Sequence, residues 1–175
     1  MTERRRALGL ADLLTVLRLP LAGAFVVVQD AGWRLAILAA AAASDLLDGA
    51  IARRFGPSRF GAFIDPVADK LFMACAFGVV LFSGRLTWYE ILAVLARDLV
   101  AAGAFFVVAA QRRPAAIPAR AGGKAVTVLQ ALTLLAFLAH WPLLRPMAWA
   151  TGAVGLYAIW DYQRVARTAA RAVGE

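Results

Sequence analysis

The chain has 175 residues, of which 62% are hydrophobic and only 17% are charged, and its mean hydropathy is +0.71. Soluble domains are usually about half apolar and about a quarter charged, so this excess of apolar residues is typical of a protein embedded in lipid. The formal net charge is +8. Because the basic residues lie between long apolar runs, they favour an anionic membrane surface over nucleic acid as the partner.

Six apolar runs are each long enough to predict a membrane-spanning helix, which needs about 20 residues. Glycine- and proline-containing stretches such as Gly56-Pro57-Ser58 separate the runs. The predicted spans cover residues 10–28, 33–54, 62–83, 87–111, 122–140 and 146–168. Since no polar domain remains outside them, the sequence predicts one all-α integral membrane domain over residues 1–175 with six transmembrane helices.

Lysine and arginine residues predict the orientation of these spans, because they gather in cytoplasmic loops. Thirteen lie on one side of the predicted bundle: Arg4, Arg5, Arg6, Arg53, Arg54, Arg59, Arg112, Arg113, Arg120, Lys124, Arg164, Arg167 and Arg171. Only three lie on the other side: Arg34, Arg85 and Arg145. The bias predicts a multi-pass protein of the cell membrane with its N- and C-termini in the cytoplasm.

Four aspartates fall inside the predicted spans, where a charge is unfavourable unless it is paired or hydrated. Asp45 and Asp48 lie near the end of the second span, and Asp65 and Asp69 near the start of the third. A rise of about 1.5 Å and a turn of about 100° per residue place the four carboxylates at similar depth, facing one gap. Such a cluster stays ionised only with cations between its members, and oxygen ligands favour Mg²⁺, Mn²⁺ or Ca²⁺.

Two other interpretations of the aspartates stay open on the residues alone. Each carboxylate could pair separately with an arginine such as Arg53 or Arg59. The chain could also be a small cation transporter with an acidic filter. A transporter predicts polar residues continuing to the outer face, but the spans become apolar there, with Arg97-Asp98 as the only charged step.

The aspartates belong to a longer motif that resembles the signature of the CDP-alcohol phosphatidyltransferase family. The motif fixes eight positions over 25 residues: Asp45, Asp48, Gly49, Ala52, Arg53, Gly61, Asp65 and Asp69. Seven residues separate Arg53 from Gly61, where the family pattern usually has eight, and the missing residue falls in a turn that tolerates deletion. Further along, Ala96-Arg97-Asp98 and the segment 123–130 resemble the branch that makes phosphatidylglycerol phosphate.

The resemblance implies a reaction and a role for each matching residue. A phosphatidyl group would pass from CDP-diacylglycerol to an alcohol, glycerol 3-phosphate first among the candidates, with release of CMP. Two Mg²⁺ or Mn²⁺ ions would bind the four aspartates on the cytoplasmic side, and Asp69 would also be the catalytic base. The nucleotide would lie against Gly49, Ala52 and Arg53.

The acceptor site and the assembly are implied less directly. Basic residues around the entry to the fifth span are the candidates for acceptor binding: Arg112, Arg113, Arg120 and Lys124. Arg18, level with the carboxylates by helix rise, could counter their charge or contact the donor phosphate. The alternative acceptor is phosphatidylglycerol, as in a cardiolipin synthase. The family resemblance also favours a homodimer, and the small-residue tract from Ala39 to Ser44 suits either a dimer seam or packing within the chain.

Overall fold

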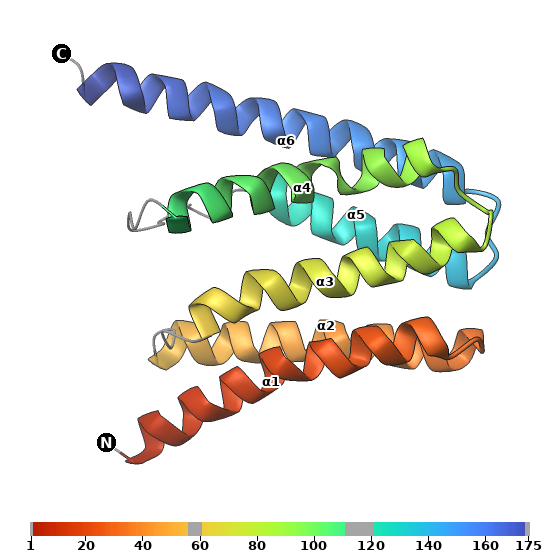
Figure 1. Ribbon diagram of the computed structural model, residues 1–175, viewed down its shortest axis with the longest axis horizontal. Coiled ribbons are helices and arrows are strands. Elements are labelled where there is room, and N and C mark those ends of the chain that lie inside the picture. The colour runs from red at the N-terminus through yellow and green to blue at the C-terminus, as the bar shows by residue number, and fades with distance from the viewer. Residues whose placement is uncertain (1, 56–60, 111–120, 174–175) are drawn as a thin grey trace. The chain divides into compact units, whose positions relative to one another are not determined.

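The computed structural model describes residues 2–55, 61–110 and 121–173. Within these ranges the chain forms six α-helices and no strand, which confirms the all-α prediction (Figure 1). The helices are α1 (Thr2–Val27), α2 (Ala31–Phe55), α3 (Gly61–Phe82), α4 (Trp88–Ala110), α5 (Ala121–Leu138) and α6 (Leu144–Val173).

Two helix ends differ from the predicted spans by more than two residues. Helix α1 begins at Thr2 instead of residue 10, and α6 ends at Val173 instead of residue 168. Both extensions are rich in arginine and alanine, which are strong helix formers. The predicted spans are shorter because they are drawn from apolar residues alone, whereas the helical backbone continues into the polar residues.

By length and composition, α2 is the one helix in the described part of the chain that could cross a bilayer. A shorter apolar helical segment covers Gly123–Leu138. The prediction of six transmembrane spans therefore stays a prediction, while the six helices themselves are observed.

The chain divides into two compact units, Met1–Phe82 and Ser83–Glu175. In the first unit, α1 packs against both α2 and α3; in the second, α6 packs against α4 and α5. The prediction of a single domain over residues 1–175 stays a prediction.

Helices α1 and α2 of the first unit each bury one stripe of side chains that is apolar at one end and polar at the other. On α1 the buried stripe is Thr15, Arg18, Ala22 and Phe25; on α2 it is Leu38, Ala41, Ser44 and Asp48. The positions recur every three or four residues, as one face of an α-helix requires. The ring of Phe25 meets the ring of Phe72 on α3 edge-on, with centroids 5.9 Å apart. This apolar packing holds the three helices together beside the polar ends of the α1 and α2 stripes.

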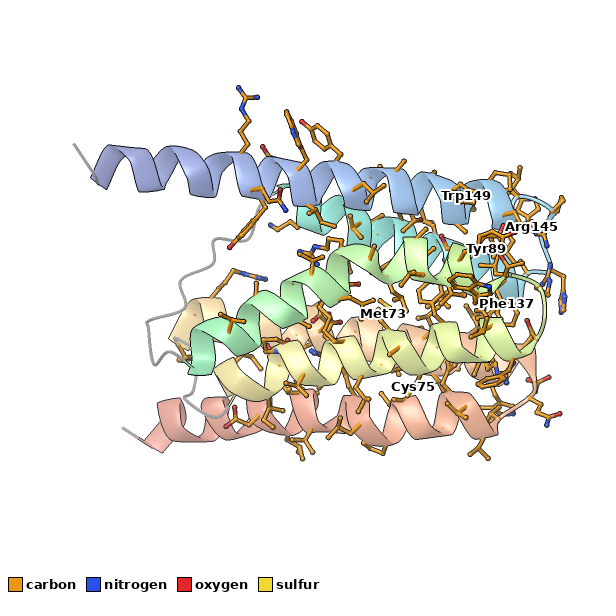
Figure 2. The ribbon with its side chains drawn as sticks, turned by 45° about the horizontal axis from the view of Figure 1, so that its top comes forward. Met73, Cys75, Tyr89, Phe137, Arg145 and Trp149 are labelled. Carbon is orange, nitrogen blue, oxygen red and sulfur yellow. The ribbon has the colours of Figure 1, made fainter. Side chains whose placement is uncertain are left out.

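In the second unit, the first turns of α4 and α6 are joined by polar and aromatic contacts. The buried carboxylate of Glu90 accepts hydrogen bonds of 2.8 Å from both the amide and the hydroxyl group of Thr87, which caps α4. Arg145 Nε lies 3.8 Å from Glu90 Oε1, and the rings of Tyr89 and Trp149 lie 6.3 Å apart. Figure 2 shows Tyr89, Arg145 and Trp149 together at this end of the unit. These contacts fix where α4 and α6 begin relative to each other.

Candidate active site

The guanidinium group of Arg18 on α1 contacts three of the four motif aspartates. Its Nη2 atom lies 3.2 Å from Asp45 Oδ1 and pairs with Asp48 Oδ2. Its Nη1 atom lies 3.4 Å from Asp65 Oδ1. Helices α2 and α3 therefore bring their carboxylates to a common point, and the cation at that point comes from α1.

Thr15, one helical turn before Arg18, contacts two of the same carboxylates. Its hydroxyl group lies 2.8 Å from Asp65 Oδ1 and 3.3 Å from Asp48 Oδ2, within donor range of both. Since a hydroxyl group has a single hydrogen, it donates to one carboxylate at a time. Thr15 is only 2% exposed. The polar end of the α1 stripe thus links α2 to α3 through two side chains.

The burial of the cluster is uneven. The side chains of Arg18 and Asp48 are 2% and 4% exposed, whereas those of Asp45 and Asp65 are 56% and 42% exposed. Three carboxylates and one guanidinium leave a formal charge of −2 on this cluster. Its buried part is therefore internally paired, while two of its carboxylates can be reached by a ligand.

The fourth motif aspartate, Asp69, lies beside a different cation. Its Oδ2 atom lies 3.8 Å from Nζ of Lys70, the next residue along α3. In the described residues, no three aspartate, glutamate, histidine or cysteine side chains stand in the arrangement of a preformed metal site. The carboxylates of Asp45, Asp48 and Asp65 instead share a guanidinium group.

The chemistry of this donor set fits a divalent cation. The carboxylates supply hard oxygen ligands, and the residual charge of the cluster matches one such ion. Asp45, Asp48 and Asp65 share Arg18, so the interpretation that each aspartate pairs separately with its own arginine is wrong for these three. Arg59 itself lies outside the described residues.

The predicted nucleotide-binding residues lie on α2 just beyond the carboxylates. Arg53 is exposed, and a Cβ atom built on Gly49 would lie 3.3 Å from Arg53 Nη1. The side chain of Arg53 therefore bends back over Gly49, where a larger residue would crowd it. The helical position of Ala52 is described but its side chain is not.

Of the predicted acceptor-binding residues, only Lys124 is described, and it lies exposed in the first turn of α5. Arg112, Arg113 and Arg120 lie outside the described residues.

A second polar cluster joins α4 to α5 beside Gly123, the residue that precedes Lys124. Arg97 Nη1 donates a 2.9 Å hydrogen bond to Asp98, and Gln130 Nε2 donates one of 2.6 Å to the other oxygen of Asp98. A Cβ atom on Gly123 would lie 2.4 Å from Arg97 Nη2. A side chain at position 123 would require the guanidinium end of Arg97 to shift.

Thr15 and Gln130 belong to these two polar clusters, a placement that the sequence did not predict. The signal for Thr15 was its spacing of three residues from Arg18, which places both side chains on one helix face. No comparable local pattern marks Gln130, because its partner Asp98 lies on another helix.

The sequence model of the CDP-alcohol phosphatidyltransferase family matches residues 8–160 of this chain. A Mycobacterium tuberculosis protein named "Probable phosphatidylglycerophosphate synthase" is 35% identical over 147 residues, covering 77% of this chain and 68% of its own length. A Salmonella paratyphi A protein named "CDP-diacylglycerol–glycerol-3-phosphate 3-phosphatidyltransferase" is 34% identical over 150 residues, covering 81% of this chain and 80% of its own length.

A Drosophila melanogaster protein named "Probable cardiolipin synthase (CMP-forming)" is 36% identical over 111 residues, covering 61% of this chain and 34% of its own length. The chain spans 61% or 68% of the length of the mycobacterial relatives it matches.

The buried hydroxyl group of Thr15 generates a prediction about stability. Thr15→Val keeps the shape of the side chain but removes the donor to Asp65 and Asp48, so we expect it to lower the free energy of unfolding by about 1–2 kcal/mol. Denaturant unfolding in detergent with a chelator present measures this value. The matched control is Thr127→Val, since the Thr127 hydroxyl donates at 3.3 Å to the Gly123 carbonyl of its own helix and to no other helix in the described residues. Equal losses in the two variants would show that the link between α2 and α3 contributes nothing.

Proposed function

Because the chain belongs to the CDP-alcohol phosphatidyltransferase family, we propose that it transfers the phosphatidyl group of CDP-diacylglycerol to glycerol 3-phosphate and releases CMP. The observation that carries the proposal is the meeting of Asp45, Asp48 and Asp65 at one point, from two helices. The names of the Mycobacterium tuberculosis relative that is 35% identical and of the Salmonella relative support the same reaction.

Two Mg²⁺ or Mn²⁺ ions would be held by Asp45, Asp48, Asp65 and Asp69. When bound, such ions neutralise the pyrophosphate of the donor and stabilise the charge on its leaving group. The exposure of Asp45 and Asp65 supports this assignment, because ions and phosphates must reach the carboxylates from outside.

The remaining chemistry falls to side chains of the chain. Asp69 takes the proton from the acceptor hydroxyl group, and the hydroxyl oxygen forms a bond to the phosphorus atom that carries the diacylglycerol. The bond from that phosphorus atom to the CMP oxygen breaks, and CMP leaves. Arg18 contacts the donor phosphate, while Gly49, Ala52 and Arg53 line the nucleotide site on α2.

The acceptor phosphate would be bound by cations around the start of α5, namely Arg112, Arg113, Arg120 and Lys124. The exposure of Lys124 supports its part in this site. Arg97, held by Asp98, adds a guanidinium group beside Gly123, the residue that precedes Lys124.

A cardiolipin synthase, with phosphatidylglycerol as the acceptor, is the second candidate. The name of the Drosophila relative favours it. Both reactions use the same donor and release CMP, so they differ only in the acceptor.

We also propose a membrane arrangement with six spans, both termini and the active site at the cytoplasmic side, and two copies of the chain in a homodimer. The apolar composition of α2 and the uneven distribution of basic residues support the spans and their orientation. The exposed alanines of α2, Ala39, Ala40, Ala42 and Ala43, suit the close approach of a second helix.

The topology can be tested with reporter fusions. With six spans and inward basic residues, fusions after Gly9 and at Glu175 should both report a cytoplasmic location. A fusion in the loop at Arg85 is the matched control and should report the opposite side. An external signal from either terminus would contradict the arrangement.

The reaction can be tested by incubating the purified chain with CDP-diacylglycerol and either glycerol 3-phosphate or phosphatidylglycerol. We expect CMP and phosphatidylglycerol phosphate with the first acceptor, loss of activity with excess EDTA and recovery with Mg²⁺ or Mn²⁺. Product formed only from phosphatidylglycerol would establish the cardiolipin synthase instead. Full turnover in EDTA would refute the metal assignment.

The roles of two aspartates can be separated by substitution. Asp69→Asn should keep donor binding but lose about 10²–10⁴ in turnover, the usual effect of removing a general base. Asp48→Asn should lose donor binding as well, because Asp48 lies in the buried part of the cluster. Calorimetry with CDP-diacylglycerol beside CMP release, at saturating Mg²⁺, measures both properties. Turnover near the wild-type rate in Asp69→Asn would remove Asp69 as the base, and equal loss of binding in both variants would make it a metal ligand first.

A further inference from the structure

The guanidinium group of Arg18 has several acceptors around its terminal nitrogens but none at its Nε atom. Its two terminal nitrogens contact three carboxylates. Its Nε atom, in contrast, is buried and has no hydrogen-bond partner among the described residues. A buried donor without an acceptor destabilises a structure, and does so more strongly when the group is charged. The guanidinium is therefore placed to satisfy the carboxylates at the expense of its own hydrogen bonding.

We propose that Arg18 is an exchangeable counter-ion of the carboxylate site. It competes with divalent cations for the oxygens of Asp45, Asp48 and Asp65, and when cations bind, its N–H groups pass to a phosphate oxygen of the donor. This inference rests on the proposed function and adds to it an order of events, in which Arg18 holds the site together until cations replace it.

Arg18 competes with cations because it contacts the carboxylate oxygens that would coordinate them. Its terminal nitrogens contact Asp65 Oδ1 and Asp48 Oδ2, and the Thr15 hydroxyl lies within hydrogen-bonding range of the same two oxygens. A small divalent cation needs such oxygens at about 2.0–2.1 Å, with nearly octahedral geometry. A guanidinium group in contact with them blocks part of that coordination shell, so the cation gains full coordination only when the guanidinium withdraws.

The charges favour the same exchange. Without cations, the three carboxylates leave the cluster with excess negative charge even when Arg18 is present, so the guanidinium is strongly held. Two divalent cations would neutralise four carboxylates, and a further positive charge among them would then be repelled. A pyrophosphate arriving with the donor offers Arg18 new anionic oxygens, including an acceptor for Nε.

Burial explains why the exchange has to involve Arg18 itself. The side chain is 2% exposed, so it cannot withdraw into water without leaving the packed stripe of α1. An anionic ligand inside the site would accept the N–H groups of Arg18 while the side chain stays packed. A fixed counter-ion, in contrast, would influence the cations only through its charge.

Binding of Mn²⁺ alone separates exchange from a simple effect of charge. The full chain in detergent is titrated with Mn²⁺, without lipid, and free Mn²⁺ is followed by electron paramagnetic resonance. Arg18→Gln removes both the charge and the fork of donors, and we expect it to bind Mn²⁺ about tenfold tighter or more. Arg18→Lys keeps the charge but occupies fewer oxygens, so its affinity should lie between those of Arg18→Gln and the wild type.

Arg34→Gln is the matched control, because it removes the same charge from the same unit. Arg34 Nε donates to the backbone carbonyl of Phe25 at 3.2 Å. Its Mn²⁺ affinity should equal that of the wild type. Thermal unfolding gives a second readout: Arg18→Gln should unfold at a lower temperature than the wild type in EDTA, and saturating Mn²⁺ should close the difference. If Arg18→Gln does not fold without metal, Arg18→Lys carries the test.

Unchanged Mn²⁺ affinity in Arg18→Lys would overturn the exchange, since a fixed counter-ion predicts that result. Unchanged affinity in Arg18→Gln would overturn it as well. If the wild type bound no Mn²⁺ at all, the metal site of the proposed function would fail together with the exchange. If the wild type bound Mn²⁺ and both Arg18 variants bound it with the same affinity, the exchange alone would be refuted.

Discussion

The contact between one buried guanidinium group and three carboxylates is the constraint on which the first unit depends. Helices α2 and α3 carry like charges toward the same point, where they would repel each other at low dielectric. Arg18 turns this repulsion into attraction, and it reaches the carboxylates only because α1 packs against both helices. A buried ion pair adds little net stability in general, but removing one partner is strongly destabilising. Arg18 therefore acts mainly by determining how the three helices fit together.

The same helical faces serve packing and chemistry in turn. On α1 the stripe that packs Phe25 and Ala22 continues to Arg18 and Thr15, and on α2 the stripe from Leu38 and Ala41 continues to Asp48. The apolar part excludes water and holds the helices in register. The polar part then presents groups whose positions follow from that register. A shift of one residue in either helix would rotate the polar groups by about 100° away from each other.

The second unit uses hydrogen bonds between buried polar side chains in a similar way. Gln130 on α5 binds Asp98 on α4, and Thr133 on α5 lies 3.1 Å from Thr151 on α6. Such contacts are effective between helices in an apolar surrounding, where the alternative is an unsatisfied polar group. They align α5 with its neighbours and so determine where its first turn, with Gly123 and Lys124, begins.

The sequence by itself determined the six helices, the four aspartates and the family, because apolar runs, turn residues and motif spacing are local properties of the chain. It also placed Arg18 at the depth of the carboxylates, since helix rise alone sets that depth. Only the tertiary structure decided that Arg18 joins Asp45, Asp48 and Asp65, that Thr15 assists it, and that Asp98 pairs with Gln130. Those contacts join residues 27 to 50 positions apart. The physical reason is that periodicity gives each helix a buried face but does not specify which face of another helix will cover it.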